Sequence, residues 1–350
     1  MKKYIFILLG VVIILLIPFI LFLPKSDSVK TAQLTPIRTF GGLDVPEEAI
    51  LSSPSDMVVS PDDKIIVSDH GENKIVVFDA NGEVINQFGR EGKGPGEFQG
   101  PRFIKLEGDV LKVFDANNNR VQYFSLDGQY LNMILLRFSI GIGSFIFGVN
   151  EDVFFATNGF RVEDLINHYR IDGEKLAPIG KIEGNSFQIY EMLKMRDALI
   201  KKEVPDSLRN EIILFLSPDE KLYAFHQALP LIKVYSQEGE LEKVVRLDLS
   251  EFDEIRDRCS KLNVEGKQKG SPGVWSLKFW RDGVFTDKGD LILLISNSEK
   301  MILYKFDNEG KLIQRYECVD DNISMMAAHG TYLWAYGRDT QIFYQFKLEN

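Results

Sequence analysis

The stretch that decides the fold is FGREGKGPGEFQGPRFIKLEGDVLKVFDANNNRVQYFSLDG, residues 88–128. It contains a glycine-rich run and then short apolar runs, which are separated by Gly, Asn and Asp. Short apolar runs bounded by these residues predict β-strands joined by tight turns. We therefore expect an all-β chain.

The segment before this stretch repeats its pattern. Residues 65–89, IIVSDHGENKIVVFDANGEVINQFG, align with residues 111–134, so that Asp69 matches Asp115 and Asn73 matches Asn119. Both pairs have the same offset, 115 − 69 = 119 − 73 = 46. A similar Asn-Gly, Asp-Gly or Glu-Gly turn recurs at Gly82, Gly128, Gly173, Gly239 and Gly310. A period of this length indicates a repeat protein, and six units of about four strands predict a six-bladed β-propeller.

The two ends of the propeller region predict how the ring closes. The last unit stops after its third strand, in IFYQFKLEN, residues 342–350. Residues 34–42, LTPIRTFGG, look like a fourth strand with nothing before it. We expect residues 34–41 to form the outer strand of the last blade, so the propeller spans 34–350.

Two blade links are longer than the repeat allows. The turn spacings are 239 − 173 = 66 and 310 − 239 = 71 residues, against the period of 46. The additional residues, 185–210 and 250–273, carry apolar side chains at helical spacing, which predicts two helical inserts. Long inserts often form a lid over a site, and the alternative is that they only pack against the blades.

Residues 88–128 resemble the NHL-type repeat of six-bladed propellers, which have a TolB-like architecture. GKGPGEF matches the Gly-x-Gly-Pro-Gly-x-Phe link between blades, and DANNNRV matches the Asp-x-x-x-Asn-Arg-Val motif of the next blade. The resemblance implies that blade links and second-to-third-strand loops share one face, where propeller ligands bind near the axis. The candidate ligand-binding residues are Asp69, His70, Arg90, Glu97, Arg102, Asp115, Asn117 and His226. The alternative is structural: the glycines permit a tight link, and Asp115 and Asn119 bond loop amides.

The first 24 residues, MKKYIFILLGVVIILLIPFILFLP, contain two lysines followed by an apolar run. A helix needs about 20 apolar residues to cross a bilayer, whereas a cleavable signal peptide has an apolar core of only ~7–15. We therefore expect a transmembrane signal-anchor at 1–24, with Lys2 and Lys3 cytoplasmic and the propeller on the extracytoplasmic side. The alternative is a signal peptide that is removed. Residues 25–33 read as a polar linker.

Charge and motifs limit the function. The net charge of −10 argues against nucleic acid as a partner, and no two histidines have metal-ligand spacing, so we expect no metal and no cofactor. Cys259 and Cys318 could pair or remain free. We expect a binding or scaffold module that takes a protein, peptide or glycan ligand on the face with the inserts. The alternative is a lactonase- or lyase-like propeller enzyme with an axial metal or acid/base site, for which no catalytic residue is assigned.

Overall fold

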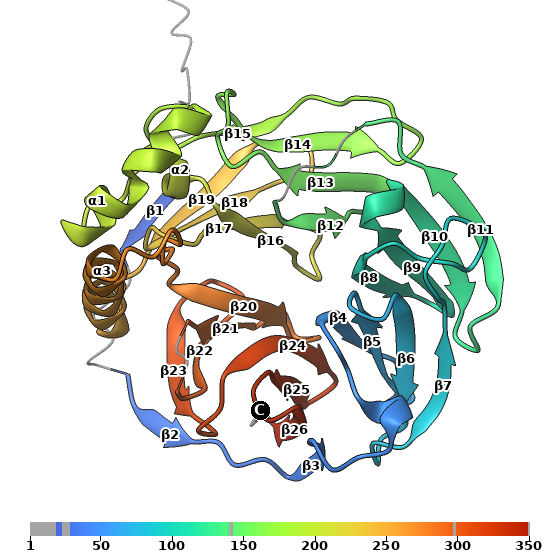
Figure 1. Ribbon diagram of the computed structural model, residues 1–350. Helices are drawn as coiled ribbons and strands as arrows, with labels where there is room; N and C mark the ends of the chain where they lie inside the picture. The colour runs from blue at the N-terminus through green and yellow to red at the C-terminus, as the bar shows by residue number, and fades with distance from the viewer. Residues whose placement is uncertain (1–18, 23–28, 139, 141–142, 297–298, 349–350) are drawn as a thin grey trace, which may run out of the picture.

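The chain folds as a ring of six antiparallel β-sheets (Figure 1). The computed structural model describes residues 19–22, 29–138, 140, 143–296 and 299–348. In each sheet the first strand lies toward the middle of the ring and the fourth lies at its rim. The predicted six-bladed β-propeller is confirmed.

Five blades consist of four consecutive strands, and the sixth takes its fourth strand from the N-terminal region. Blades 1 to 3 comprise β4 (Pro54–Val59), β5 (Ile65–Asp69), β6 (Lys74–Phe78), β7 (Val84–Phe88), β8 (Pro101–Glu107), β9 (Val110–Asp115), β10 (Arg120–Ser125), β11 (Tyr130–Leu135), β12 (Phe145–Phe147), β13 (Asp152–Ala156), β14 (Asp164–Arg170) and β15 (Ile179–Lys181). Blades 4 to 6 comprise β16 (Ile212–Leu216), β17 (Leu222–His226), β18 (Leu231–Tyr235), β19 (Leu241–Arg246), β20 (Trp280–Phe285), β21 (Leu291–Ile295), β22 (Ile302–Phe306), β23 (Leu312–Glu317), β24 (Ile323–His329), β25 (Tyr332–Gly337), β26 (Ile342–Lys347) and β3 (Arg38–Gly41). Two short 3-10 helices lie in loops: η2 (Glu47–Ala49) connects blade 6 to blade 1, and η3 (Ala116–Asn118) lies between β9 and β10 of blade 2.

The burial of the strands follows from their place in the blade. Every residue of β5, β18, β21 and β22 is buried, because a middle strand has a neighbouring blade on each side. The fourth strand β7 instead alternates between half-buried and exposed residues, as expected for a strand at the rim. The continuous apolar runs in the sequence are therefore the middle strands of the blades.

In five blades, the hairpin between the third and fourth strands contains a glycine with positive φ. Gly82, Gly128, Gly173, Gly239 and Gly310 have φ values of 91°, 83°, 104°, 92° and 78°. In the first hairpin the Gly82 amide donates to the carbonyl oxygen of Asp79, and the ladder shifts register between Val77 and Phe78. Only the glycine has positive φ, whereas a two-residue type I′ turn needs two such residues. These hairpins are thus turns with a glycine bulge, not the two-residue turns that the dipeptides suggest.

The ring closes through β3. Residues Arg38–Gly41 pair antiparallel with β26, and the Phe40 ring stacks on Phe343 with 4.7 Å between ring centroids. Phe40 also lies 5.7 Å from the Phe78 ring of blade 1. This N-terminal strand therefore joins the last blade to the first, as predicted.

The segment before β3 continues along the rim. Thr31–Gln33, part of the expected linker 25–33, form strand β2, which pairs parallel with β23 of blade 5. Phe19–Phe22 form β1, which pairs parallel with β19 of blade 4. The rest of the expected membrane segment 1–24, and residues 25–28, lie outside the described residues. Among the residues described, no helix is long and apolar enough to cross a membrane.

The two inserts are helical, as predicted, and they pack together. The first contains η4 (Ile189–Lys194), α1 (Met195–Ile200) and α2 (Asp206–Arg209), and the second is α3 (Glu251–Gln268). Ser260 Oγ donates to the carbonyl oxygen of Ile200 at 2.7 Å, and Lys267 pairs with Asp197 at 2.7 Å. Both inserts follow a fourth strand, so they share one face with the blade links, which we call the insert-bearing face. The helices lie at the periphery beside blades 4 and 5, not across the ring (Figure 1), which does not support a lid.

Both cysteines are free. Cys259 is buried in α3, where its Sγ donates to the carbonyl oxygen of Trp275 at 3.3 Å. Cys318 follows β23 of blade 5. Burial raises the pKa of both thiols, to about 12 at Cys318.

Candidate functional site

The motif that begins at Asp115 is a clamp on the link between blades 1 and 2. Asp115 is fully buried at the end of β9, and its Oδ2 accepts a hydrogen bond from Arg120 Nε at 2.9 Å. The same guanidinium donates to the carbonyl oxygens of Lys93, Gly94 and Glu97 at 2.7, 2.9 and 2.7 Å. Asp115 therefore orients a buried arginine, which holds the glycine-rich link in place.

Asp69, the matching residue of blade 1, is also bound by the fold. Its carboxylate is fully buried and accepts hydrogen bonds from the backbone amides of Ser52, Ser53 and Gly71 at 2.8, 2.9 and 3.0 Å. Buried carboxylate oxygens of this kind fix a loop, because each donor would otherwise be unsatisfied. Asp69 and Asp115 are thus buried beneath the insert-bearing face, where they stabilise its loops and do not reach solvent.

The asparagines of the repeat complete this support. Asn73 and Asn119 have φ values of 55° and 50°, a left-handed conformation that Asn tolerates better than most residues. Asn73 Oδ1 accepts from the Gly100 amide at 2.8 Å, and Asn119 Nδ2 donates to the carbonyl oxygens of Leu136 and Phe138 at 2.9 Å. Each asparagine therefore fastens the blade link that follows its own repeat.

A pocket of about 400 Å³ opens between blades 1 and 2 on the insert-bearing face. It is lined by His70, Gly71, Asn73, Glu91, Gln99, Gly100 and Asn117. Gly100, at φ 79°, forms part of its floor: a Cβ there would lie 3.1 Å from Asn117 Nδ2 and 3.3 Å from His70 Nε2. The imidazole and the amide therefore converge on Gly100. Such a wall offers donors and acceptors for hydroxyl and amide groups.

The structure brings four of the predicted site residues together here. His70 and Asn117 line the pocket. Asp69 and Asp115 bind the backbone of two other lining residues, through the amides of Gly71 and of Gln99 at 3.0 and 2.7 Å. The repeat, rather than any catalytic motif, is the sequence signal that leads to this pocket.

Three other predicted residues of blades 1 and 2 neither line the pocket nor bind the residues that line it. Arg90 pairs with Glu97 at 2.8 Å, on the exposed side of the blade link. The Gly94 amide, and then Arg90, hold the pKa of Glu97 below its ordinary value. Arg102 is exposed on β8, where the ladder to β9 shifts register between Pro101 and Phe103.

His226 is not grouped with the others. It ends β17 of blade 4, is completely buried, and has Nδ1 2.7 Å from the carbonyl oxygen of Arg209 in the first insert. Nδ1 must therefore carry the proton, and Nε2 has no hydrogen-bond partner within the described part of the chain. Burial lowers the pKa of His226 to about 4, so the ring is neutral. The sequence could not indicate this, because the insert that covers His226 packs through tertiary contacts.

The middle of the ring carries two carboxylates that the sequence analysis does not select. Asp56 on β4 and Asp282 on β20 occupy first strands, and each also bonds the next blade. Asp56 Oδ2 accepts from the Ile104 amide at 2.8 Å, and Asp282 Oδ2 accepts from the Met326 amide at 2.6 Å. Both side chains touch solvent but are enclosed by protein, and this burial raises the pKa of both to about 7, with the charge of Asp56 adding to the increase at Asp282. The available signal was the shared position of the two aspartates, since each is the third residue of its first strand.

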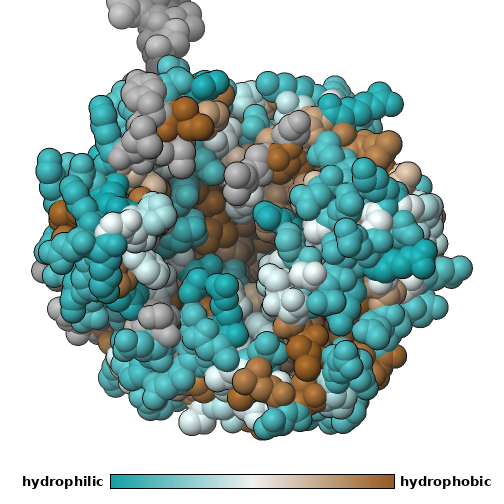
Figure 2. Space-filling model, in the orientation of Figure 1, coloured by the Kyte–Doolittle hydropathy of each residue, from teal (hydrophilic) through white to brown (hydrophobic). Residues whose placement is uncertain are grey.

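The ring is hollowed at its middle. Figure 2 shows the hollow, with apolar side chains over β16 forming part of its wall. No group of three or more His, Cys, Asp or Glu side chains that could hold a metal ion occurs among the described residues. Asp56 and Asp282, whose pKa is raised to about 7, are groups that could move a proton at the middle of the ring.

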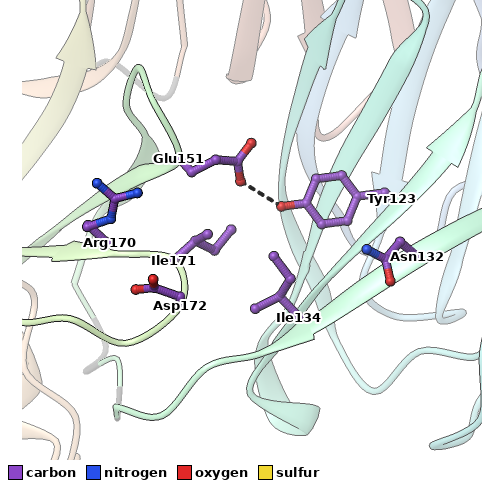
Figure 3. Close-up of a pocket in the computed structure, with 7 residues that line it drawn as sticks. All are labelled: Tyr123, Asn132, Ile134, Glu151, Arg170, Ile171 and Asp172. Atoms are coloured by element: carbon purple, nitrogen blue, oxygen red, sulfur yellow. Dashed lines mark hydrogen bonds between the residues drawn. The ribbon is translucent and has the colours of Figure 1, made fainter.

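A second cavity, of about 350 Å³, lies between blades 2 and 3 toward the opposite face (Figure 3). Its lining comprises Tyr123, Asn132, Ile134, Glu151, Arg170, Ile171 and Asp172, none of which the sequence analysis selects. Tyr123 donates to Glu151 Oε2 at 2.9 Å, and buried Lys112 contacts Glu151 Oε1 at 3.1 Å. Both carboxylate oxygens of Glu151 thus have protein partners, and these contacts hold the cavity wall in place.

Comparison with solved structures identifies other propellers at low sequence identity. A member of the DUF4221 family from Bacteroides vulgatus has a TM-score of 0.56 at 8% identity, over 91% of this chain and 98% of that one. The β-propeller domain of Cps50 (Swd1) from Myceliophteria thermophila has a TM-score of 0.52 at 12% identity, over 90% and 99%. A catalytically inactive virginiamycin B lyase from Staphylococcus aureus with quinupristin has a TM-score of 0.50 at 12% identity, over 89% of each chain. These similarities establish the fold alone.

Comparison at the sequence level gives the family. No curated protein matches the sequence significantly. A family model, that of DUF5128, matches residues 22–225, which is more than half of the chain, and its description is "6-bladed beta-propeller". With six blades in the structure and this match, the chain belongs to the DUF5128 family of six-bladed β-propellers.

Proposed function

We propose that this protein is an extracytoplasmic binding module that takes a polar ligand, a glycan or a peptide, in the pocket between blades 1 and 2. The observation that carries the proposal is the convergence of His70 and Asn117 on the backbone of Gly100. The pocket has no apolar side chain in its lining, so hydrogen bonds to hydroxyl or amide groups would provide its specificity. We further propose that blades 1 and 2 are NHL-type repeats, whose clamps keep this face rigid.

The test is a binding screen of the purified protein against immobilised glycans and peptides, followed by titration of the hits. We expect Asn117→Ala and His70→Ala to weaken binding by about 10- to 100-fold each, since each removes a hydrogen-bonding group. Asn132→Ala is the matched control, because Asn132 lines the cavity of the opposite face. Equal binding by Asn117→Ala and Asn132→Ala would exclude this pocket as the ligand site.

We also propose that the N-terminal apolar segment anchors the propeller to a membrane as an uncleaved signal-anchor. The support is the length of the apolar run after Lys2 and Lys3. Mass spectrometry of protein isolated from its native membrane tests this: we expect the intact N-terminus. A mature chain that begins near Lys25 would favour the cleaved signal peptide.

A second candidate function is an enzyme that uses the carboxylates of Asp56 and Asp282. Carboxyl groups with a pKa near 7 suit general acid or base chemistry at neutral pH. Incubation with lactones and cyclic esters tests this, and we expect Asp282→Asn to abolish any turnover that Asn117→Ala leaves intact. Turnover that survives Asp282→Asn and Asp56→Asn would reject these carboxylates as catalytic.

A further inference from the structure

Three arginines from separate elements gather on the insert-bearing face at blades 5 and 6. Arg258 belongs to α3, Arg281 to β20, and Arg338 directly follows β25. They lie far apart in the sequence, and the fold brings them together in a chain whose net charge is −10. We call them the arginine cluster.

Hydrogen bonds place the side chains of Arg281 and Arg258 and the backbone of Arg338 around one corner. Arg281 Nη2 donates to Asn322 Oδ1 at 2.8 Å, and the backbone amide of Arg338 donates to the carbonyl oxygen of the same Asn322 at 2.9 Å. Arg258 Nη2 donates to the carbonyl oxygen of Ser296 at 2.9 Å. Ser296 directly follows Ile295, which pairs with Trp280 in the ladder between β20 and β21. Arg258 therefore contacts the end of β21 that lies beside the start of β20, next to Arg281.

Arg281 lies at the start of a first strand, near the middle of the ring on the insert-bearing face. The ladder between β20 and β21 shifts register between Trp280 and Asp282, so Arg281 is the bulged residue of a first strand. Its side chain is half-buried, and its Nε is a buried donor without a hydrogen-bond partner in the described chain. A buried donor left in this way costs free energy until an acceptor reaches it.

Electrostatics points the same way. Burial, and then the positive charges of Arg338 and Arg258, lower the pKa of Arg281. The acid near it is Asp339, which acts over a distance and accepts from Asn322 Nδ2 at 3.4 Å. No carboxylate of the described residues lies within ion-pair distance of Arg281 or Arg338. The repulsion within the cluster would be relieved by a bound anion.

We infer that the arginine cluster is an oxyanion-binding site, which takes a carboxylate, phosphate or sulfate group of a ligand at the mouth of the ring. A guanidinium offers paired N–H donors that match such groups, and Arg281 and Arg338 provide such donors from two separate elements, with the positive charge of Arg258 beside them. The second insert supplies Arg258, which gives this insert a role on the face besides packing. This site is independent of the proposed pocket at blades 1 and 2.

The experiment measures thermal unfolding of the full chain in detergent, with inorganic phosphate or glucuronate titrated against chloride at equal ionic strength. We expect a saturable rise in Tm of about 2 °C when the anion is at ten times its dissociation constant. Arg281→Gln/Arg338→Gln should abolish the rise. The matched control, Arg90→Gln/Arg137→Gln, removes two exposed arginines elsewhere and should keep it, as should Asn117→Ala, which alters the other pocket.

Basal stability provides a second readout. Without added anion at low salt, Arg281→Gln/Arg338→Gln should have a Tm no lower than that of Arg90→Gln/Arg137→Gln, because it removes repulsion. A response to phosphate alone identifies a tetrahedral oxyanion as the ligand group, and a response to glucuronate alone identifies a carboxylate; either result supports the site. No saturable response in the natural chain, or an equal response in Arg281→Gln/Arg338→Gln, would overturn the inference.

Discussion

At the scale of the residue, Arg120 and Lys74 occupy matching positions of the repeat, but their side chains make very different numbers of polar contacts. Arg120 bonds Asp115 and three link carbonyls while almost fully buried. Lys74 occupies the same position in blade 1 and is half-buried, but its side chain makes no hydrogen bond or ion pair to any described residue. The difference arises because only blade 2 has the glycine-rich link whose carbonyls face the guanidinium.

We therefore predict that Arg120→Ala lowers the free energy of unfolding by about 3–5 kcal/mol, since it leaves Asp115 buried without its cation. Lys74→Ala, the matched substitution, should change it by only about 0.5 kcal/mol. Urea denaturation followed by tryptophan fluorescence measures both. Similar losses for the two variants would show that the clamp does not stabilise the link.

The carboxylates of the ring predict a pH dependence. The pKa of Asp56 and Asp282 is about 7 in the folded chain against 3.8 as the ordinary value, so the folded state holds more protons between these limits. Stability from these groups is therefore lost as pH rises from about 4 to 7. Asp56→Asn/Asp282→Asn keeps one acceptor oxygen in each side chain but removes the ionisable groups and with them this loss. The variant should therefore gain on the order of 5 kcal/mol over the natural chain at pH 8 relative to pH 5.

Melting curves at pH 5 and pH 8 measure this difference. Other carboxylates also titrate in this range, so only the comparison between the variant and the natural chain is informative. An identical pH dependence in both proteins would mean that the two carboxyls ionise at their ordinary pKa.

At the scale of the element, α3 is part of the core of blades 4 and 5. Phe252 is buried, with its ring centroid 4.4 Å from that of Phe279 and 5.3 Å from that of Trp280. Glu251 accepts from Tyr304 at 2.7 Å and from Arg315 at 3.0 Å, which ties the start of the helix to β22 and β23. A helix held in this way is a wedge between two blades and not a mobile lid.

Hydrogen exchange followed by mass spectrometry tests this placement. We expect peptides from 251–268 to exchange about as slowly as those from β21 and β22, because they open with the blades. Phe252→Ala should accelerate exchange in α3 and cost about 3–5 kcal/mol, whereas Asp253→Ala, at the neighbouring exposed position, should do neither. Fast exchange of α3 in the natural chain would restore the lid hypothesis.

At the scale of the whole molecule, stability depends on a single closure. β3 supplies the fourth strand of blade 6, and Phe40 contacts rings of both the last and the first blade. Without it, β26 would become an open edge, a surface on which strands of other molecules pair. The ring thus closes through a strand that is separated from its partner by almost the whole chain.

We predict that Phe40→Ala lowers the free energy of unfolding by about 2–4 kcal/mol and keeps unfolding cooperative. Ile37→Ala is the control, because Ile37 is 56% exposed, and it should have little effect. A chain that begins at Gly42 should lose both β2 and β3 and aggregate, whereas one that begins at Leu34 should remain monomeric. Size-exclusion chromatography and calorimetry distinguish these outcomes, and equal melting temperatures for the two shortened chains would refute the closure.

The sequence by itself determined the number of blades, the positions of the glycine turns, the closing strand and the helical inserts. Each depends on a signal within one repeat or one insert: the offset of 46 residues from Asp69 to Asp115, the positive φ that glycine permits, or apolar spacing. The pairing of β2 with blade 5 and the burial of His226 depended instead on segments that meet only in the folded ring. The same is true of His70 and Asn117, of Asp56 and Asp282, and of the arginine cluster. Their distances are decided by how the blades stand around the axis, and the spacing of residues along the chain does not encode distances across a closed ring.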